Sequence, residues 1–310
     1  MEYRRLGLSG LQVSVIGLGT NRFGTVASDK EVQNIIDAAL DLGINFLDSA
    51  NIYTGGRSEE TLGRALQGRW DRFILATKFA MRAGDGPNDR GASRYHMMNA
   101  LEASLKRLQS DHIDLYYVHQ WDDHTPLEET LRALDDAVRM GKVRYVGASN
   151  FAAWQLAEAN LLAEWRGWAP FVVIQSEYHL LQRDVEREIL SYCRSRGVGL
   201  IPYFPLAGGF LTGKYERGKP PPPGSRGESN EYVQGYLTDA HFDRLERLQD
   251  WARARGREIN ELAIAWLLAH PEVPSVIAGA TRLDQVLSNV KAADWKLSAQ
   301  EMSEIGDILQ

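Results

Sequence analysis

Short apolar runs alternate with amphipathic stretches along almost the whole chain. The apolar runs are rich in β-branched and aromatic residues, a composition typical of strands that are buried on both faces. These predicted strands cover residues 15–19, 44–48, 72–78, 113–119, 143–149, 171–175, 198–204 and 275–280. The pattern therefore predicts eight strands, each separated from the next by a long connection.

The connections carry apolar residues at i, i+3, i+4 and i+7, the spacing of an amphipathic helix. We expect helices over residues 29–43, 93–108, 126–141, 151–165, 184–197 and 238–256. Ser58, followed by Glu59 and Glu60, predicts the start of a further helix after the second strand. Several of the predicted helices end at a glycine, namely Gly43, Gly141, Gly197 and Gly256.

Strand–helix units repeated eight times predict a (β/α)8 TIM barrel, which we expect to be one domain over residues 1–310. A doubly wound open sheet is the alternative, but it usually has fewer units. The stretch "GLGTNRFG" (17–24) is also not a complete G-x-G-x-x-G fingerprint at a helix start. Residues 3–14 predict a hairpin, with its turn at Leu8–Gly10, that covers the bottom of the barrel.

Residues 213–237 interrupt the repeat with a stretch that is rich in proline and glycine. The stretch is too polar for a core, so it is either a disordered insertion or a lid. Its place after the seventh predicted strand favours a lid over the top of the barrel.

Composition excludes several classes of protein. The net charge of −6 and the scattered basic residues argue against a nucleic-acid surface. No apolar run reaches the roughly 18 residues of a membrane span, and the N-terminus lacks the apolar segment of a signal peptide. The single cysteine, Cys193, fits a buried thiol in a reducing compartment. We therefore expect a soluble, cytoplasmic protein, whose oligomeric state the sequence does not indicate.

Four polar residues follow or end three consecutive predicted strands: Asp48, Tyr53, Lys78 and His119. Each one alone has an ordinary structural explanation, such as a cap or a packed aromatic. In a barrel, however, the carboxyl ends of neighbouring strands surround one face, where active sites lie. We therefore expect these four side chains to meet.

Such a group can deliver a proton. A tyrosine pKa of about 10 is too high for easy proton exchange near neutrality, and a nearby ammonium typically lowers it by ~1–3 units. Lys78 is expected to stabilise the Tyr53 phenolate, while Asp48 keeps Lys78 charged and in place. Tyr53 with His119 would then orient and polarise a substrate carbonyl, and Tyr53 would protonate its oxygen.

Long motifs around these residues resemble the aldo-keto reductase family over nearly the whole chain. They are residues 43–63, 74–78, 104–119, 141–151, 174–181 and 202–215. The resemblance implies a (β/α)8 barrel that binds NAD(P)H at its mouth and reduces an aldehyde or ketone to an alcohol. It also implies a catalytic tetrad of Asp48, Tyr53, Lys78 and His119, with Tyr53 as the acid.

The same resemblance implies which residues bind the cofactor. Ser149 and Asn150, together with Gln175, would hold the nicotinamide carboxamide, and Tyr203 would stack on the nicotinamide ring. The pyrophosphate would lie on the backbone of Leu206, Gly208 and Leu211, beside Lys214. The implied contacts also include Gly19, Thr20, Asn21, Asp48, Phe204, Gly279, Arg282, Gln285 and Asn289.

Two departures from the family pattern concern the phosphates. Phe204 stands where many members have a serine, so a hydroxyl that could bond a phosphate is missing. On the adenosine side, Gly279 and Ala280 replace Lys-Ser, Gln285 replaces an arginine and Ser288 replaces a glutamate. Arg282 is the one cation of this stretch, and its planar fork suits a 2′-phosphate. We therefore expect NADPH rather than NADH.

The substrate side is less readable, because strand-end loops build it. Trp121 is the best candidate for a pocket wall, next to Tyr53 and His119. Weaker candidates on neighbouring loops are Arg22, Phe23, Met81 and Arg82. The loop 80–94 is expected to fold over the site. The aromatic lining favours aldehydes or ketones with an apolar or cyclic body, and the loop spacing of His119 and His124 argues against a metal site.

Two other functions remain open at this point. The same barrel serves as the cofactor-binding β subunit of potassium channels, which keeps the tetrad. The sequence shows no long N-terminal extension, and this favours catalysis over such a regulatory role. Alcohol oxidation would use the same residues in the reverse direction.

Overall fold

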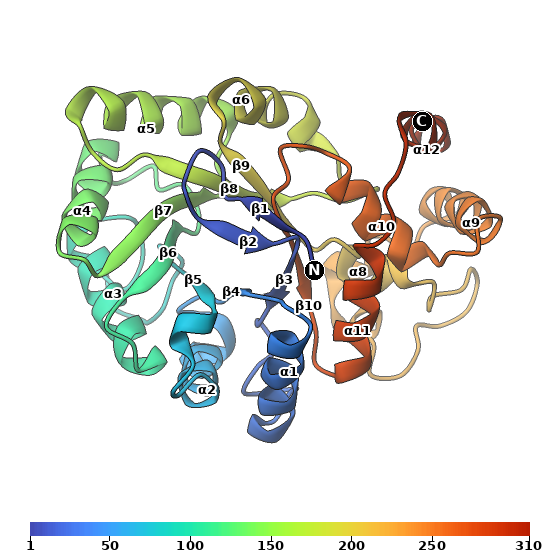
Figure 1. The fold of residues 1–310 in the computed structure, drawn as a ribbon, viewed down its shortest axis with the longest axis horizontal. Helices are drawn as coiled ribbons and strands as arrows, with labels where there is room; N and C mark the ends of the chain where they lie inside the picture. Colours follow the sequence, from blue (N-terminus) through green and yellow to red (C-terminus); the bar gives the residue numbers. More distant parts are fainter.

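The computed structural model describes all residues, 1–310. Eight parallel strands form a nearly closed barrel with helices around it (Figure 1). The strands are β3 (Ile16–Gly19), β4 (Phe46–Asp48), β5 (Ile74–Phe79), β6 (Ile113–Val118), β7 (Val143–Ser149), β8 (Phe171–Glu177), β9 (Gly199–Tyr203) and β10 (Val276–Gly279). Hydrogen bonding runs in the order β10-β3-β4-β5-β6-β7-β8-β9. The predicted barrel and its eight strands are confirmed.

The predicted helices are also present on the outside of the barrel. They are α1 (Asp29–Asp41), α2 (Arg57–Ala65), α3 (Arg94–Leu108), α4 (Leu127–Arg139), α5 (Ala153–Arg166), α6 (Ile189–Arg196) and α9 (Asp239–Arg253). Three further helices beyond residue 256 were not predicted, namely α10 (Ile259–Leu268), α11 (Leu283–Ala292) and α12 (Ala299–Leu309), and neither were two short helices within residues 213–237. No helix is both long and apolar enough to cross a lipid bilayer.

The start of α2 corrects one prediction. Ser58 does not cap this helix, because Gly56 is the residue that precedes its first turn. The Ser58 side chain is fully buried, and its hydroxyl donates to the Thr20 carbonyl at 2.9 Å. A serine before two glutamates is typical of a helix start. In this chain the serine instead connects α2 to the strand ends by its hydrogen bond to Thr20.

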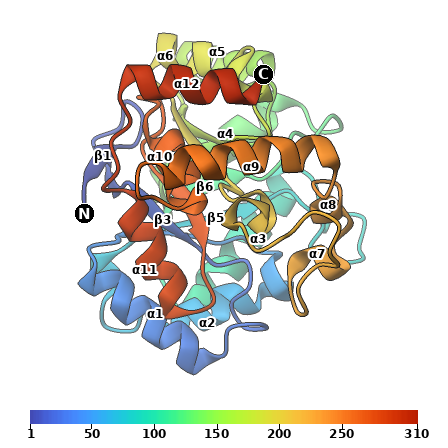
Figure 2. The same cartoon turned by 90° about the vertical axis from the view of Figure 1, so that its right-hand side faces the viewer.

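The N-terminal hairpin consists of β1 (Tyr3–Arg5) and β2 (Gln12–Ser14), paired antiparallel. Its turn begins earlier than predicted, because the Leu6 N–H donates to the Leu11 carbonyl at 2.8 Å. Leu6 and Val13 are fully buried and join the core cluster that fills the barrel interior. In Figure 2 the hairpin and α7–α8 lie at opposite ends of the barrel. The hairpin therefore closes the bottom, as predicted.

Residues 213–237 are folded rather than irregular throughout. They contain two short helices, α7 (Arg226–Ser229) and α8 (Glu231–Gln234). Tyr215, Val233 and Tyr236 of this segment are buried in the main core cluster. The Gly227 N–H donates to the Tyr215 hydroxyl at 2.9 Å, which fixes the segment internally. The structure thus supports the folded alternative over a disordered insertion.

Candidate active site

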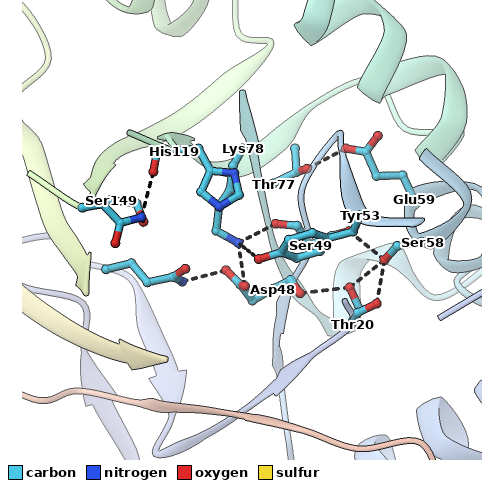
Figure 3. Close-up of polar contacts among 12 residues, drawn as sticks. Thr20, Asp48, Ser49, Tyr53, Ser58, Glu59, Thr77, Lys78, His119 and Ser149 are labelled. Carbon is cyan, nitrogen blue, oxygen red and sulfur yellow. Dashed lines mark hydrogen bonds and ion pairs between the residues drawn. The ribbon is translucent and has the colours of Figure 1, made fainter. Parts of the chain in front are cut away.

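The four residues of the predicted tetrad meet at the carboxyl ends of β4, β5 and β6 (Figure 3). Asp48 ends β4, Lys78 lies one residue before the end of β5, and His119 follows β6 directly. Tyr53 begins a 3₁₀ turn that leads into α2. The rings of Tyr53 and His119 meet edge to face, with 5.9 Å between their centres. The predicted convergence of these side chains is therefore confirmed.

The Lys78 ammonium lies at the centre of the group. It donates to Asp48 Oδ2 at 2.6 Å, to the Ser49 carbonyl at 2.6 Å and to the Tyr53 hydroxyl at 3.2 Å. Lys78 is 0% exposed. Burial disfavours its charge, but the Asp48 carboxylate and the Tyr53 hydroxyl outweigh burial, and the pKa of Lys78 is raised. Lys78 is thus a buried cation at neutral pH.

The acid strength of Tyr53 differs from the prediction made from sequence. Burial raises the pKa of the Tyr53 phenol, and the opposing effect of Lys78 is smaller. The prediction of a lowered pKa was wrong because sequence reveals the partner of a group but not the depth at which it is buried. A raised pKa suits an acid, since the phenol keeps its proton at neutral pH and Lys78 would stabilise a phenolate if that proton left.

His119 is neutral in this environment. Burial, and then the charge of Lys78, lower the pKa of His119 to about 3. Its buried Nδ1 has no hydrogen-bond partner in the protein. A neutral imidazole can donate one hydrogen bond without adding a second positive charge beside Lys78. His119 is therefore suited to orient a carbonyl oxygen rather than to supply the proton.

Thr20 supports the site from the side. Its hydroxyl donates to the Asp48 carbonyl at 2.9 Å, and the Thr20 side chain is 0% exposed. The hydroxyls of Ser49 and Ser58 lie 3.0 Å apart and complete a buried chain that reaches α2 (Figure 3). The Thr20 hydroxyl thus holds the end of β4. The predicted cofactor contact of Thr20 would therefore involve the other atoms of this residue.

The residues predicted to hold nicotinamide lie next to the tetrad. Gln175 on β8 is buried, and its amide donates to Asp48 Oδ1 at 2.8 Å. Asn150 has a positive φ of 58° and donates to the His119 carbonyl at 3.0 Å. The Tyr203 hydroxyl donates to Asn150 Oδ1 at 2.9 Å. These bonds bring the predicted nicotinamide residues next to the predicted tetrad.

Ser149 ends β7 and is fully buried. Its hydroxyl accepts a hydrogen bond from Asn150 Nδ2 at 3.1 Å. Ser149 also pairs with Gln175 across β7 and β8, so both predicted carboxamide ligands share one register position. The barrel register therefore explains why residues distant in sequence can serve one amide group.

The predicted pyrophosphate seat is a 3₁₀ turn over Ala207–Thr212. Gly208 and Gly209 have φ values of +64° and +106°, which a residue with a side chain rarely adopts. A Cβ atom at Gly209 would lie 2.8 Å from Lys214 Nζ, so the lysine packs on bare backbone. Lys214 forms no ion pair with a carboxylate. An unpaired ammonium on a glycine turn fits a diphosphate.

Leu206 and Leu211 frame this turn. Leu206 precedes it, and Leu211 within it is fully buried in the core. The Leu206 carbonyl accepts the N–H groups of both Gly209 and Leu211, at 2.8 and 3.1 Å. The turn is therefore held by hydrogen bonds of its own backbone, and the backbone rather than these side chains would contact a ligand.

On the adenosine side, Arg282 is exposed and its fork is bonded to Asp284, with both N–O distances at 3.0 Å. Gln285 accepts from the Thr281 N–H at 2.8 Å, which orders the start of α11. The Asn289 side chain is 5% exposed. Ser288 is held by Asn260 at 2.8 Å. Arg282 is thus placed as predicted, but it already has a partner of its own.

Gly19 and Gly279 lie opposite each other in the register of β3 and β10. A Cβ atom at Gly279 would meet only Asn21 Oδ1 and the Gly19 carbonyl, each at 3.9 Å. The space beside Gly279 is therefore open, whereas a Cβ atom at Gly19 would lie 3.0 Å from Ile277 Cγ2. The cofactor contacts of Gly19, Asn21 and Gly279 remain predictions.

The positions of the predicted substrate residues agree less well with the prediction of a common pocket. Phe23 is 0% exposed, so its ring is part of the core and does not line an open pocket. The Trp121 ring packs against Phe151 and Trp154, with centroid distances of 5.2 and 5.7 Å. The Trp121 side chain therefore packs against α5. Met81 is half-buried, while Arg22 and Arg82 are exposed.

Sequence reasoning missed the contacts between residues 213–237 and the strand ends. Phe204 has a positive φ of 53°, and its ring stacks on Tyr232 at 6.0 Å. The Arg226 guanidinium lies 5.5 Å from the Phe204 ring centre and has no carboxylate partner. Glu177 accepts hydrogen bonds from the hydroxyls of Tyr232 and Tyr236. The only signal in the sequence was the phenylalanine that replaces a serine.

Burial, and then the charge of Arg22, lower the pKa of Arg226. Neither Arg22 nor Arg226 forms an ion pair with a carboxylate, and the charge of Arg22 acts on Arg226. Like charges repel, so this arrangement favours the binding of an anion. Arg226 is a functional candidate that the sequence analysis did not name.

Comparisons with known proteins agree with this geometry. The chain matches the model of the Aldo/keto reductase family over residues 15–310. It is 38% identical to the uncharacterized oxidoreductase YrpG of Bacillus subtilis, over 99% of this chain and 96% of that protein. It is 38% identical to a probable voltage-gated potassium channel subunit beta of Arabidopsis thaliana, over 95% of this chain and 92% of that protein.

A third relative is the L-glyceraldehyde 3-phosphate reductase of Escherichia coli O157:H7. It is 37% identical, over 98% of this chain and 91% of that protein. The matches extend over almost the full length of each relative, and they include the strand ends that carry the tetrad. This chain belongs to the aldo-keto reductase family.

Proposed function

We propose that this protein reduces an aldehyde or ketone to an alcohol with NADPH. The observation that carries the proposal is the buried Lys78–Asp48 ion pair at 2.6 Å, with the Tyr53 hydroxyl 3.2 Å from the same ammonium. Burying a lysine and its carboxylate partner costs solvation free energy. Such a pair beside a phenol is therefore typical of a functional site. Membership of a family of NAD(P)H-dependent oxidoreductases supports the reaction class.

In the proposed reaction, bound NADPH supplies a hydride to the carbonyl carbon. Tyr53 donates its proton to the carbonyl oxygen, and Lys78 stabilises the phenolate that forms. Asp48 keeps Lys78 charged, since the two are in direct contact. Neutral His119 donates a hydrogen bond that orients the carbonyl toward Tyr53. The proton thus leaves a neutral phenol, and the positive charge that favours this step is already in place.

The cofactor assignment rests on the cations around the mouth. Lys214 lies on the glycine turn without a carboxylate partner, and Arg226 is likewise unpaired. We propose that these two residues hold the diphosphate. Arg282 would hold the 2′-phosphate of NADPH after leaving Asp284, with which it forms an exposed ion pair. Such a pair is worth only ~0–1 kcal/mol, so it does not prevent the exchange.

The direct test follows the loss of NADPH absorbance with several carbonyls, including an aromatic aldehyde and glyceraldehyde 3-phosphate. We expect turnover by the wild type and a fall of at least ~10²-fold in Tyr53→Phe, the usual loss for a general acid. Tyr116→Phe is the matched control. Tyr116 is fully buried and stacks on Phe79 rather than facing Lys78. NADPH binding by each variant should match the wild type.

The similarity to a potassium channel β subunit supplies a second candidate, a cofactor-binding regulatory role. It would gain support if the wild type bound NADPH but turned over no carbonyl faster than Tyr53→Phe. Alcohol oxidation with NADP would use the same residues, with Tyr53 as the base. Measuring both directions distinguishes these outcomes.

A further inference from the structure

Two neighbouring tyrosines on β6, Tyr116 and Tyr117, are fully buried, and neither hydroxyl has a hydrogen-bond partner. Successive residues of a strand point to opposite faces, so these rings lie on the two sides of the barrel wall. Tyr116 belongs to the main core cluster and stacks on Phe79 at 5.0 Å. Tyr117 belongs to the cluster that fills the barrel interior. The proposed reaction assigns no role to either residue.

Tyr117 lies directly against the catalytic group. The Lys78 ammonium is 5.8 Å from the centre of the Tyr117 ring and 4.9 Å from the centre of the Tyr53 ring. An aromatic face attracts a cation within ~6 Å of its centre. The ammonium therefore lies within reach of two tyrosine rings, while it donates hydrogen bonds to Asp48, the Ser49 carbonyl and the Tyr53 hydroxyl.

The barrel makes room for the Tyr117 ring. Gly147 faces it from the neighbouring strand β7, in direct register with Tyr117. A Cβ atom at Gly147 would lie 2.7 Å from Tyr117 Cε1 and 2.8 Å from Cδ1, well inside van der Waals contact. Any larger residue at position 147 would push the ring toward Lys78. The position of the ring is therefore set by packing.

We propose that Tyr117 is a positioning residue, whose ring forms the floor beneath Lys78 and keeps its ammonium within reach of the Tyr53 hydroxyl. The ring and not the hydroxyl does this, because the ring centre lies 5.8 Å from the ammonium and the hydroxyl is not among the hydrogen-bond partners of Lys78. Without the ring, the ammonium would be free to move away from the Tyr53 hydroxyl while keeping its hydrogen bond to Asp48. The kinetic consequence rests on the proposed function, but the position of the ammonium does not.

Three variants isolate the ring. Tyr117→Leu removes it, Tyr117→Phe keeps it without the hydroxyl, and Tyr116→Leu removes an equally buried ring on the other side of the same strand. We expect kcat of Tyr117→Leu to fall by at least about tenfold, with the Kd of NADPH and the KM of the carbonyl unchanged, because a displaced catalytic group costs rate more than binding. The solvent deuterium isotope effect on kcat should rise, since proton transfer from Tyr53 becomes slower.

Tyr117→Phe should retain the kcat and the isotope effect of the wild type. Tyr116→Leu should lower the temperature of unfolding in the same way as Tyr117→Leu but leave the isotope effect unchanged. Tyr117→Met, which fills more of the vacated space, takes the place of Tyr117→Leu if that variant does not fold.

A second readout needs no turnover. The buried ammonium of Lys78 should give a slowly exchanging ¹⁵N–¹H signal, identified by its loss in Lys78→Met. We expect its exchange with solvent to accelerate in Tyr117→Leu but not in Tyr117→Phe or Tyr116→Leu. The proposal is overturned if the signal is as protected in Tyr117→Leu as in the wild type, or if Tyr116→Leu changes it equally. If the wild type reduces no carbonyl, the proposed function fails while this test remains valid.

Discussion

His119 shows how burial at the residue scale sets a charge state that the sequence does not reveal. Its imidazole has a pKa of about 3 in the folded protein, against 6.5 for an ordinary histidine. Between these two values the unfolded chain binds a proton at this position and the folded protein does not. Stability therefore falls as the pH drops below about 6.5, with a slope of ~1.4 kcal/mol per pH unit for a single group.

This predicts the behaviour of His119→Gln. Glutamine does not titrate, so the variant should lose less stability on acidification than the wild type does. We expect the difference in free energy of unfolding between the two proteins to change by ~1 kcal/mol per pH unit between about pH 6 and 4.5. Urea unfolding at several pH values measures it, and two parallel profiles would show that His119 titrates normally in the folded protein.

Tyr53 marks the limit of sequence reasoning at this scale. The motif placed a phenol beside an ammonium, and the 3.2 Å contact confirms that pairing. The direction of the pKa shift was nevertheless wrong, because burial outweighs Lys78. Partners of a site follow from strand order, which the sequence encodes locally. The depth of a side chain depends on all the surrounding elements together.

At the scale of elements, two helical glycines illustrate opposite effects of the same change. A Cβ atom at Gly63 of α2 would lie 2.5 Å from the Arg107 carbonyl oxygen and 2.8 Å from that of Leu108, at the end of α3. Gly306 of α12 has nothing within 4 Å of such an atom. Close packing of α2 on α3 therefore requires a glycine, and the position in α12 does not.

We expect Gly63→Ala to destabilise the protein by ~1–3 kcal/mol through overpacking. Gly306→Ala should stabilise it by ~0.5–1 kcal/mol, because alanine is the better helix former. Thermal unfolding of the two variants beside the wild type is sufficient. A similar loss in both would mean that neither effect depends on local packing.

The contact between Phe204 and Tyr232 joins the end of β9 to the segment 213–237. An aromatic pair is worth ~0.5–1.5 kcal/mol beyond its buried area, so its loss should make opening of this segment about fivefold more frequent. We predict that Phe204→Ser speeds tryptic cleavage at Arg217 or Arg226 by that factor. Phe204→Tyr keeps a ring and should resist cleavage like the wild type; equal rates for both variants would mean that the stack does not hold the segment.

Helix α10 shows why some elements escaped prediction. Nine of its residues are buried, so the sequence lacks the polar face that marks an amphipathic helix. A run of this kind cannot be distinguished from a buried strand by periodicity alone. The barrel strands, by contrast, are short and separated by amphipathic helices, so their regular repetition made them readable. Phe204 also acquired its role only from the segment that folds back onto it.

The molecule as a whole combines a barrel with a mouth that carries two cations without carboxylate partners. Lys214 and Arg226 lack carboxylate partners, whereas Arg282 is bonded to Asp284. A ligand that binds only the folded protein stabilises it by RT ln(1 + [L]/Kd), so differences in cofactor affinity appear in the unfolding temperature of the entire chain. Cofactor preference can thus be measured without a known substrate.

We predict that Arg282→Ala weakens NADPH binding by about tenfold, close to the ~1.5 kcal/mol of a charge-assisted hydrogen bond. NADH binding should not change, because NADH has no 2′-phosphate for this side chain to hold. Asp284→Asn should strengthen NADPH binding by up to about fivefold, since the exposed pair that it removes is worth ~0–1 kcal/mol. Thermal shifts with each cofactor provide the comparison.

The pattern across both variants decides what sets the preference. Opposite effects on NADPH, with NADH constant, would mean that Asp284 competes with the 2′-phosphate for the Arg282 fork. Equal weakening of both cofactors by Arg282→Ala would instead mean that this arginine only orders the start of α11, where it precedes Leu283. If neither variant changes NADPH binding, the 2′-phosphate is held elsewhere, and Arg226, which has no carboxylate to displace, becomes the residue to change next.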